Sequence, residues 1–421
     1  MVRTQYITLI YTYLHLLYFY VIKKNENFHR LTCEMTMPVN TNVDNPLLND
    51  AEVVQRIFNH IDNSTTDIGN NTWKEPVENY QSKERLNTEL KLLQNRSIVF
   101  CPSGAFTKPG DYVSRDVAGI PLIAVRGLDG KIRAFRNACR HRGVQLANGH
   151  GCARALVCPY HGWAYSLDGS LRSIPHEHGF PDVDKATRGL VAVACAEIDG
   201  LVYINQDPQA DIQSDVSAVP KLMPDKHRLL SSDNIIIQAN WKLYIESALE
   251  GYHIRETHKA TFYPVQYDNL TVVEAFGENS RVAFPYQSIE GLRNKAQTSL
   301  CADGRLTYVY HLFPNVLIST FPGCMQVVVI EPIDESTTRQ HTYLVTGIDE
   351  NDTELLDTVF QGQKFAAKGV IEDQKIVLSA QKGLLSGANE YLEFGLFESA
   401  ITRMHTHLKI EIELLAGPSV Q

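Results

Sequence analysis

Two cysteine–histidine pairs are the residues in this 421-residue sequence whose types and spacing most clearly suggest chemistry. The first pair is Cys139-Arg-His141 and the second is Cys158-Pro-Tyr-His161. Two thiolates and two imidazoles could complete the tetrahedral shell of one zinc ion. Common zinc modules, however, pair cysteine with cysteine and histidine with histidine, whereas each segment here supplies one ligand of each kind. The order of the ligands therefore argues against zinc.

An iron–sulfur cluster explains the same order. If the two thiolates bind one iron and the two imidazoles bind the other, the site is a Rieske [2Fe–2S] centre, which carries one electron at a time. Gly143, Gly162 and Pro159 would let two loop tips approach such a cluster closely, and Trp163 and Tyr165 would shield it from water. Structural zinc and metal-free buried cysteines remain the alternatives.

A second group of potential metal ligands follows later in the chain. His253 and His258 form an H-x4-H pattern at the end of NWKLYIESALEGYHIRETH, residues 240–258. Two histidines and one carboxylate form the facial triad of non-haem Fe(II) oxygenases, which leaves coordination positions open for dioxygen. On a straight α-helix five residues advance by about 500°, so the two imidazoles would point about 140° apart. We therefore expect the helix to end or bend between Tyr252 and His258.

These motifs resemble those of a known family. C-R-H-R-G followed by C-P-Y-H-G-W, and N-W-K with E-x3-E-x-Y before the two histidines, are similar to the signature of Rieske-type non-haem iron oxygenases, the family of the aromatic-ring-hydroxylating dioxygenases. The resemblance covers residues 75–415 and implies an oxygenase component that oxidises a small molecule with O2. It implies two cofactors, a Rieske cluster and a mononuclear Fe(II). It also implies that a separate NAD(P)H-linked reductase or ferredoxin supplies the electrons, and that the chain forms a homotrimer, because electrons pass between subunits.

The resemblance also assigns roles to acidic residues. It implies that an Asp on a late helix completes the iron site with the two histidines, and IEDQKIVLSAQKGLLS, residues 371–386, is similar to that helix. Asp373 matches the ligand position and Glu372 is the alternative; a solvated first turn of a helix is the other interpretation of both residues. Glu250 is implied to hydrogen-bond a cluster histidine of the neighbouring subunit and so to link the two irons. The alternative for Glu250 is an exposed acidic stripe that includes Glu246.

Position 250 also bears on the substrate. Many ring-hydroxylating dioxygenases have Asp at this place, whereas Glu250 resembles the carnitine- and betaine-type monooxygenases, so we expect a quaternary ammonium substrate. An aromatic cage, worth about 2 kcal/mol when desolvated, could bind it. The available rings are those of Tyr263, Tyr267, Phe284, Tyr286, Tyr308 and Tyr310. An aromatic-ring-hydroxylating dioxygenase or demethylase is the alternative function, and a pure Rieske electron carrier is a further one.

Bulk composition limits the partners and the compartment. The formal charge of −9 argues against nucleic acid, whose binding needs concentrated Lys and Arg. The eight cysteines are spread without the density of a disulfide scaffold, so we expect a reducing, cytoplasmic location. The apolar run at residues 5–22 is of marginal membrane-spanning length. A dispensable extension and a packing helix are the alternatives to a membrane anchor, and we expect no membrane association.

The periodicity of the sequence predicts an α+β fold. From residue 97 to 208, short apolar runs alternate with turn residues, which predicts a small antiparallel β domain. After it we expect a sheet flanked by long helices. The predicted helices are 51–62, 82–95, 240–254, 353–386 and 393–415, and the predicted strands are 271–275, 306–320, 325–332 and 341–347. The expected division is an N-terminal extension and linker (1–50), a helical segment that packs with the catalytic domain (51–96), the Rieske domain (97–208) and the catalytic iron domain (209–421).

Overall fold

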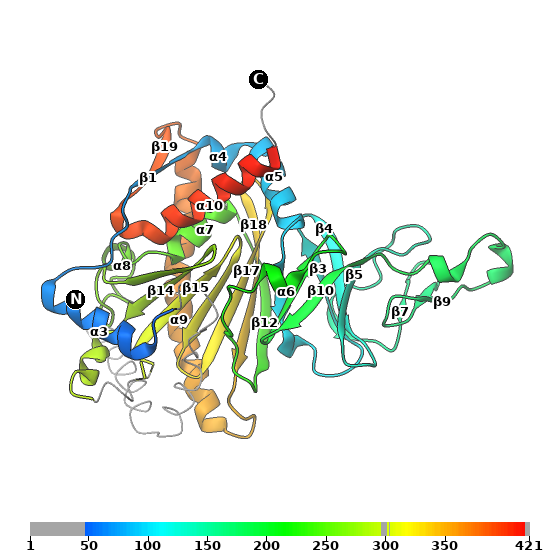
Figure 1. The fold of residues 1–421 in the computed structure, drawn as a ribbon, viewed down its shortest axis with the longest axis horizontal. Coiled ribbons are helices and arrows are strands. Elements are labelled where there is room, and N and C mark those ends of the chain that lie inside the picture. Colours follow the sequence, from blue (N-terminus) through cyan, green and yellow to red (C-terminus); the bar gives the residue numbers. More distant parts are fainter. Residues whose placement is uncertain (1–46, 296–300, 303, 417–421) are drawn as a thin grey trace, which may run out of the picture.

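Two seven-stranded antiparallel sheets organise the chain (Figure 1). A computed structural model describes residues 47–295, 301–302 and 304–416. The first sheet has the strand order β2-β11-β10-β5-β4-β3-β6. Its strands are β2 (Ile98–Pro102), β3 (Asp111–Val117), β4 (Ile120–Arg126), β5 (Ile132–Arg136), β6 (Gly149–Cys152), β10 (Ala192–Ile198) and β11 (Leu201–Asn205). A small third sheet, β7 (Leu156–Val157), β8 (Ala164–Tyr165) and β9 (Leu171–Ser173), lies at the end of the molecule far from the main helices (Figure 1).

The second large sheet carries the long helices. Its order is β12-β18-β17-β16-β15-β14-β13. The strands are β12 (Arg228–Ile237), β13 (Val272–Phe276), β14 (Asn279–Pro285), β15 (Leu306–Leu312), β16 (Val316–Phe321), β17 (Cys324–Asp334) and β18 (Thr337–Thr346). The helices are α3 (Asp50–Asn63), α4 (Glu78–Gln81), α5 (Lys83–Gln94), α6 (Ile212–Asp215), α7 (Trp241–Ala248), α8 (Ile254–Thr257), α9 (Thr353–Leu384) and α10 (Ser399–Ala416). Outside both large sheets, β1 (Trp73–Pro76) pairs with β19 (Tyr391–Phe394).

The second sheet separates two hydrophobic cores, because successive side chains of a strand point to opposite faces. Leu317 and Val328 pack in a core with residues of α7, α9 and α10. Ile318 and Val327, their neighbours along the strands, pack in another core that also contains β2, β11 and α3. One face of the second sheet is therefore covered by helices, and the other joins the core of the first sheet.

A buried ion pair connects the two large sheets. Arg115 of β3 and Glu331 of β17 are each 3% exposed, and Arg115 Nη1 lies 3.2 Å from Glu331 Oε2. The backbone N–H of Ala118 also donates to the Glu331 carboxylate, and Arg115 Nε donates to the carbonyl of Phe100. Burial raises the pKa of Glu331 to about 7, although Arg115 and the Ala118 N–H act in the opposite direction. The pair is therefore fully charged only above neutral pH.

The α+β class is confirmed, but several predicted elements differ. The predicted strand 306–320 is two strands, β15 and β16, which pair antiparallel with each other. The predicted helix 393–415 begins only at Ser399, because residues 391–394 pair with β1 instead. Strands β12 and β14 were not predicted, since β12 is mostly exposed and β14 is buried at all seven positions, so neither alternates between apolar and polar residues.

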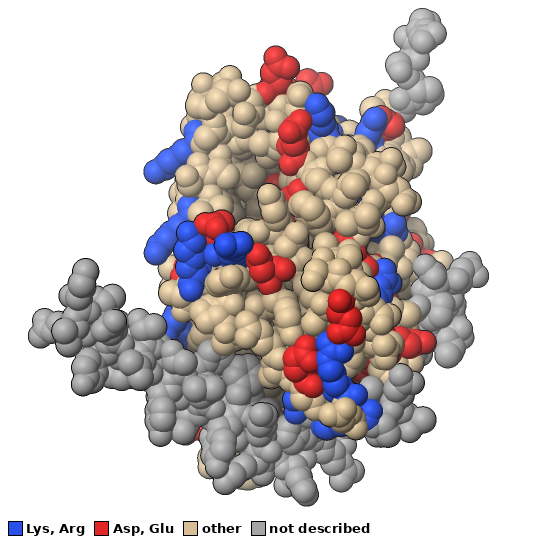
Figure 2. Space-filling view, turned by 90° about the vertical axis from the view of Figure 1, so that its left-hand side faces the viewer, with Lys and Arg blue, Asp and Glu red and all other residues tan. Residues whose placement is uncertain are grey.

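The surface charges and the membrane-spanning potential of the helices complete the description of the fold. The face of the molecule on the left of Figure 1 carries Lys, Arg, Asp and Glu in small mixed groups among uncharged residues, and it is hollowed near its centre (Figure 2). In the ranges that the structure describes, none of the helices combines the length and the apolar composition needed to span a membrane. The apolar run at residues 5–22 lies outside those ranges.

We predict that Arg115→Gln destabilises the protein at pH 8.5, where the Glu331 carboxylate is ionised. The substitution leaves that carboxylate buried without the counter-charge that opposes its desolvation, which costs about 3–5 kcal/mol. Thermal unfolding followed by circular dichroism should show a clearly lower midpoint. Asp116→Asn is the matched control, because Asp116 forms an exposed pair with Arg339 at 3.4 Å and exposed pairs contribute about 1 kcal/mol or less. Equal midpoints for the two variants would contradict the prediction.

Candidate metal centres

The chain breaks its helix where the first histidine ligand is expected. Asn240 caps α7 by accepting a hydrogen bond from the N–H of Lys242, but α7 ends at Ala248, and α8 covers only Ile254–Thr257. The break therefore comes earlier than the predicted position between Tyr252 and His258. Its cause is local, because the Glu250 carboxylate accepts hydrogen bonds from the backbone N–H groups of Tyr252 and His253, which a continuous helix would bond to its own carbonyls.

The break brings three potential ligand atoms together. His253 Nε2 lies 3.2 Å from His258 Nε2, and Asp373 Oδ1 lies 2.9 Å from His258 Nε2 and 3.5 Å from His253 Nε2. Atoms at neighbouring corners of an octahedron with bonds of about 2.1 Å are about 3 Å apart. Two imidazole nitrogens and one carboxylate oxygen on one side of a site form the donor set of the non-haem Fe(II) triad. The three residues therefore fit such an ion.

Two further carboxylates hold the other ring nitrogens. Glu250 Oε1 accepts a hydrogen bond from His253 Nδ1, and Glu372 Oε2 lies 2.8 Å from His258 Nδ1. Thr261 Oγ1 donates to the same Glu372 oxygen at 2.5 Å. Carboxylates at Nδ1 fix the tautomer that leaves Nε2 free for a metal, and they orient the ring. Both Nε2 atoms are thus presented toward Asp373.

Asp373 and Glu372 have different positions although they are adjacent. Asp373 contacts Nε2 of His258, whereas Glu372 contacts Nδ1 on the other side of the same ring. Both lie in the interior of α9, so the interpretation of a solvated first helical turn is wrong. The Glu250 residue is 9% exposed, so the interpretation of an exposed acidic stripe is wrong as well.

The carboxylates also change the protonation of His253. Burial disfavours the imidazolium form, but the hydrogen bond to Glu250 and the charges of Glu250 and Asp373 outweigh it, so the pKa of His253 is raised above its usual value. A cation is therefore favoured at this place. A metal ion that binds here would replace the proton on the ligand nitrogen.

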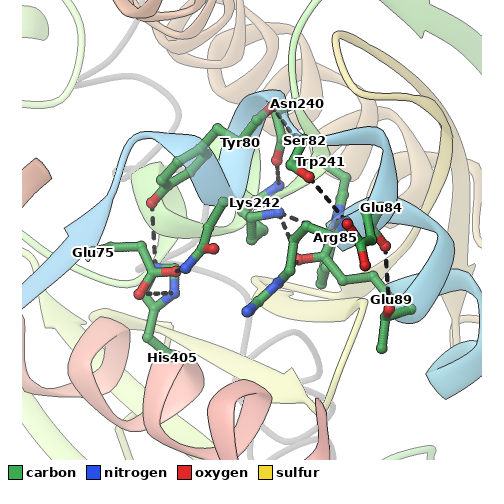
Figure 3. A network of polar contacts seen from close by, with 12 residues as sticks. Glu75, Tyr80, Ser82, Glu84, Arg85, Glu89, Asn240, Trp241, Lys242 and His405 are labelled. Atoms are coloured by element: carbon green, nitrogen blue, oxygen red, sulfur yellow. Dashed lines mark hydrogen bonds and ion pairs between the residues drawn. The ribbon is translucent and has the colours of Figure 1, made fainter. Parts of the chain in front are cut away.

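A buried polar network anchors α7, which leads into the site (Figure 3). Lys242 Nζ lies 2.8 Å from Glu89 Oε1, and the two side chains are 0% and 1% exposed. Tyr80 Oη donates to Glu246 Oε1 at 2.7 Å, and His405 Nε2 lies 2.9 Å from the same oxygen. Buried charges are costly to leave unpaired, so these contacts resist any shift of α7. The helix end next to Glu250 is fixed as a result.

A cavity of about 140 Å³ opens beside the three ligand atoms. Its floor is formed by strands β14, β15, β16 and β17, and its other walls come from α7, α9 and the segment 253–266. A water molecule occupies about 10–15 Å³ by the same measure, so the cavity holds a ligand of roughly ten non-hydrogen atoms. Most of the lining is apolar or aromatic, as in small-molecule sites.

The aromatic rings of this cavity are only partly those expected. Of the six candidate rings, Phe284 and Tyr286 line the cavity. Tyr308 and Tyr310 instead pack in the other core, where the Arg281 guanidinium lies 4.6 Å and 5.9 Å from their ring centroids. Tyr263 and Tyr267 do not line the cavity either. The lining rings that the sequence did not indicate are those of Tyr244, Phe262 and Phe321.

The two cysteine–histidine loops are built alike. The backbone N–H of Cys139 donates to the carbonyl of Val144, and that of Gly143 donates back to Cys139. The Cys158 loop repeats both bonds with Trp163 and Gly162. Both glycines have positive φ, +77° and +73°, which other residues rarely adopt. Each loop therefore turns tightly and presents its cysteine and its histidine from the same tip.

The two histidine rings of these loops are neighbours, and the two cysteines lie in the same hydrophobic core. Cys139 and Cys158 are buried, and the imidazole centroids of His141 and His161 are 4.7 Å apart. Tyr165 Oη lies 3.3 Å from Cys139 Sγ. The pKa of His141 is lowered, first by desolvation and then by the positive charges of His161 and Arg142. Two buried thiols and two adjacent imidazoles fit the donor set of a Rieske cluster.

Aromatic rings cover the histidine side of the loops. Trp163 stacks on His141 with the ring planes 7° apart, and the Phe180 edge contacts both rings. Tyr160 stacks on His161 at a centroid distance of 3.7 Å and is 52% exposed. The edge of the two loops that carries His141 and His161 is thus shielded from water at His141 and accessible at His161. An electron can enter or leave a cluster by such an edge.

The fold and these two centres define an oxygenase component with a Rieske cluster and a non-haem iron. Residues 97–188 match the Rieske [2Fe–2S] domain, and residues 217–412 match the catalytic domain of the ring-hydroxylating alpha subunit. The chain is 30% identical over 333 residues to the carnitine monooxygenase oxygenase subunit of Escherichia coli (strain K12). The matching region covers 75% of this chain and 85% of that protein. The chain therefore belongs to the Rieske-type non-haem iron oxygenases.

Other relatives show the range of the family. The glycine betaine monooxygenase oxygenase subunit of Chromohalobacter salexigens is 38% identical over 155 residues, 35% of each chain. A crystal structure of the quaternary ammonium Rieske monooxygenase CntA has a TM-score of 0.70 at 22% identity and covers 86% of this chain and 98% of that chain. Naphthalene 1,2-dioxygenase with indole bound has a TM-score of 0.66 at 20% identity, covering 80% and 92%. These structures support the fold.

We predict that Glu372→Ala weakens binding of Fe(II) at the three-residue site by about 10- to 100-fold, because His258 loses the partner that orients its ring. Titration of iron-free protein with Fe(II) measures the affinity. Asp357→Ala is the matched control, since Asp357 is an exposed acid on the same helix. An unchanged affinity in Glu372→Ala would show that the carboxylate at Nδ1 does not orient the ring.

Proposed function

We propose that this oxygenase component oxidises a quaternary ammonium compound such as carnitine or betaine. The observation that carries the proposal is the meeting of the His253, His258 and Asp373 ligand atoms beside a cavity lined by aromatic rings. Cation–π contacts with such rings stabilise ammonium groups. The carnitine and glycine betaine monooxygenase subunits among the relatives support the same class of substrate.

The proposal assigns the residues of both centres. Cys139, His141, Cys158 and His161 hold the [2Fe–2S] cluster, and His253, His258 and Asp373 hold the mononuclear iron. When bound, the cluster stores single electrons and the iron activates dioxygen. The residues of this chain hold the metals, orient the substrate and exclude water from the cavity. Insertion of one oxygen atom into a C–H bond consumes O2, two electrons and two protons and releases the hydroxylated product and water.

Electrons come from NAD(P)H through a separate reductase or ferredoxin, and we place the transfer between the two centres across a subunit boundary. Glu250 contacts His253 within its own chain, and its proposed second partner is a cluster histidine of a neighbouring copy. A closed ring of three copies would give every iron a neighbouring cluster. The proposed assembly is therefore a homotrimer with Glu250 as the link.

The proposed division of the chain keeps 97–208 as the Rieske domain and 209–421 as the catalytic domain, with 1–50 as extension and linker and 51–96 packed on the catalytic domain. Helix α3, in the segment 51–96, supports its packing on the catalytic domain, because Val53 and Ile57 lie fully buried in a core with Val272 and Phe276 of β13. A cytoplasmic location is proposed because reduced cysteines must be available to hold a cluster.

A second candidate function is the oxidation of an aromatic ring. The large oxygenase component of the naphthalene 1,2-dioxygenase system of Ralstonia is 29% identical over 310 residues, covering 62% of this chain and 69% of that protein. A largely apolar cavity also suits an aromatic hydrocarbon. The two candidate functions differ in their substrates, so an assay with both kinds of compound distinguishes them.

We predict that substrate-dependent O2 uptake, measured with the purified chain, a compatible reductase and NADH, responds to quaternary ammonium compounds. The panel consists of L-carnitine, glycine betaine and choline against benzoate and naphthalene. Turnover of at least one ammonium compound above the rate with aromatic compounds is the expected result. Oxidation of the aromatic compounds alone would establish the second candidate function instead.

We predict that two inactive variants restore activity to each other. Cys139→Ser removes a proposed cluster ligand and Asp373→Ala removes a proposed iron ligand. When the two chains are coexpressed equally and assemble at random, three quarters of the trimers contain both chains. Each of these mixed trimers has one working cluster–iron junction, compared with three in a wild-type trimer. About one quarter of wild-type activity is therefore expected. Differently tagged chains establish that mixed oligomers form. Mixed oligomers without activity would place electron transfer within one chain.

A further inference from the structure

The floor of the cavity carries two neutral polar side chains side by side. Ser319 of β16 and Gln326 of β17 are register partners, and both line the cavity. Within the ranges that the structure describes, neither side chain makes a hydrogen bond to another protein group, and both are partly exposed into the cavity. A hydroxyl and a carboxamide together offer donors and acceptors to a ligand.

The surroundings of this pair are apolar. Leu317 precedes Ser319 on the same face of β16, Val328 follows Gln326 on the same face of β17, and Phe321 lies beyond Ser319. On the β16–β17 part of the floor a polar group of a ligand therefore has Ser319 and Gln326 as its hydrogen-bonding partners. The other polar lining groups lie elsewhere, because Thr307 of β15 bonds the Tyr286 hydroxyl and Gln266 belongs to the segment 253–266. An unpaired polar group there would cost free energy of desolvation.

The charged groups of the cavity lie on the helical side. Among the described lining residues, the carboxylates are those of Glu250 and Asp373, which accompany the two histidines. Two carboxylates balance the charge of one Fe(II) ion, so the site has no excess positive charge for a carboxylate of the substrate. A substrate carboxylate beside the neutral pair would be buried without a counter-charge, which is costly.

We infer that Ser319 and Gln326 bind an alcohol group, and that the substrate is a quaternary ammonium alcohol. The inference rests on the proposed quaternary ammonium class and, within that class, favours an alcohol without a carboxylate over carnitine and betaine, which both carry one. An alcohol O–H donates to the Gln326 carboxamide oxygen and the alcohol oxygen accepts a hydrogen bond from the Ser319 hydroxyl, so the alcohol is satisfied as donor and as acceptor. The ammonium group is then left to the aromatic rings and to the side of the cavity that carries the carboxylates.

Choline and glycine betaine test the inference, because they share a trimethylammonium group and differ in bearing an alcohol or a carboxylate. With wild-type protein, reductase and NADH, kcat/KM for choline should exceed that for glycine betaine by about 10-fold or more, since a site built for a hydroxyl discriminates strongly. A higher kcat/KM for glycine betaine would overturn the inference and leave the proposed function intact. Turnover of naphthalene or benzoate with neither ammonium compound would overturn the proposed function itself.

Variants of the floor test the assigned residues. Gln326→Leu and, separately, Ser319→Ala should raise KM for choline by about 3- to 10-fold with little change in kcat, because each removes one hydrogen bond to bound substrate. Gln326→Lys should shift the preference toward glycine betaine by adding a counter-charge. Gln238→Leu is the matched control, since Gln238 is exposed and lies outside the cavity. Visible absorption of the cluster and iron content report correct folding. Unchanged KM values for choline in folded Gln326→Leu and Ser319→Ala would overturn the assignment.

Discussion

The structure depends on the approach of two imidazole nitrogens and one carboxylate oxygen to within 3.5 Å of one another. Three atoms that all carry lone pairs repel one another at such distances unless a proton or a cation lies between them. The protein enforces the approach from outside, because Glu250 and Glu372 hold the far nitrogens of His253 and His258. The three residues and their two supporting carboxylates therefore form one unit, and its chemistry calls for a metal ion.

The rest of the fold supplies the rigidity that this unit needs. The buried pairing of Lys242 with Glu89 and the contacts of His405 fix α7, while the long helix α9 carries Asp373 and Glu372 on adjacent positions. The second sheet closes the cavity from below, and the Arg115 pair ties that sheet to the first sheet, whose strands β5 and β6 flank the Cys139 loop. Electron storage and substrate oxidation are thus assigned to separate parts of one framework.

The sequence predicted the features that depend on residues a few positions apart. It did not predict the features that depend on contacts between residues far apart in the chain. The cysteine–histidine loops were recognisable because each is closed by bonds within a few residues, and the break after α7 was expected because two histidines in H-x4-H cannot share a helical face. The break was placed too late, because the capping by the Glu250 carboxylate depends on a side-chain conformation. The contact of Glu372 with His258 joins residues far apart in sequence. Ser319 and Gln326 share the cavity floor through strand register, which a single sequence does not specify.

Iron content tests the central claim, the existence of a mononuclear iron site separate from the cluster, most directly. Reconstituted wild-type protein should contain about three iron atoms per chain, two of them in the cluster. His258→Ala should contain about two and keep the visible absorption and the reduced-state paramagnetic resonance of the Rieske cluster. Two iron atoms per chain in both proteins, or loss of the cluster signal together with the third iron, would contradict the account.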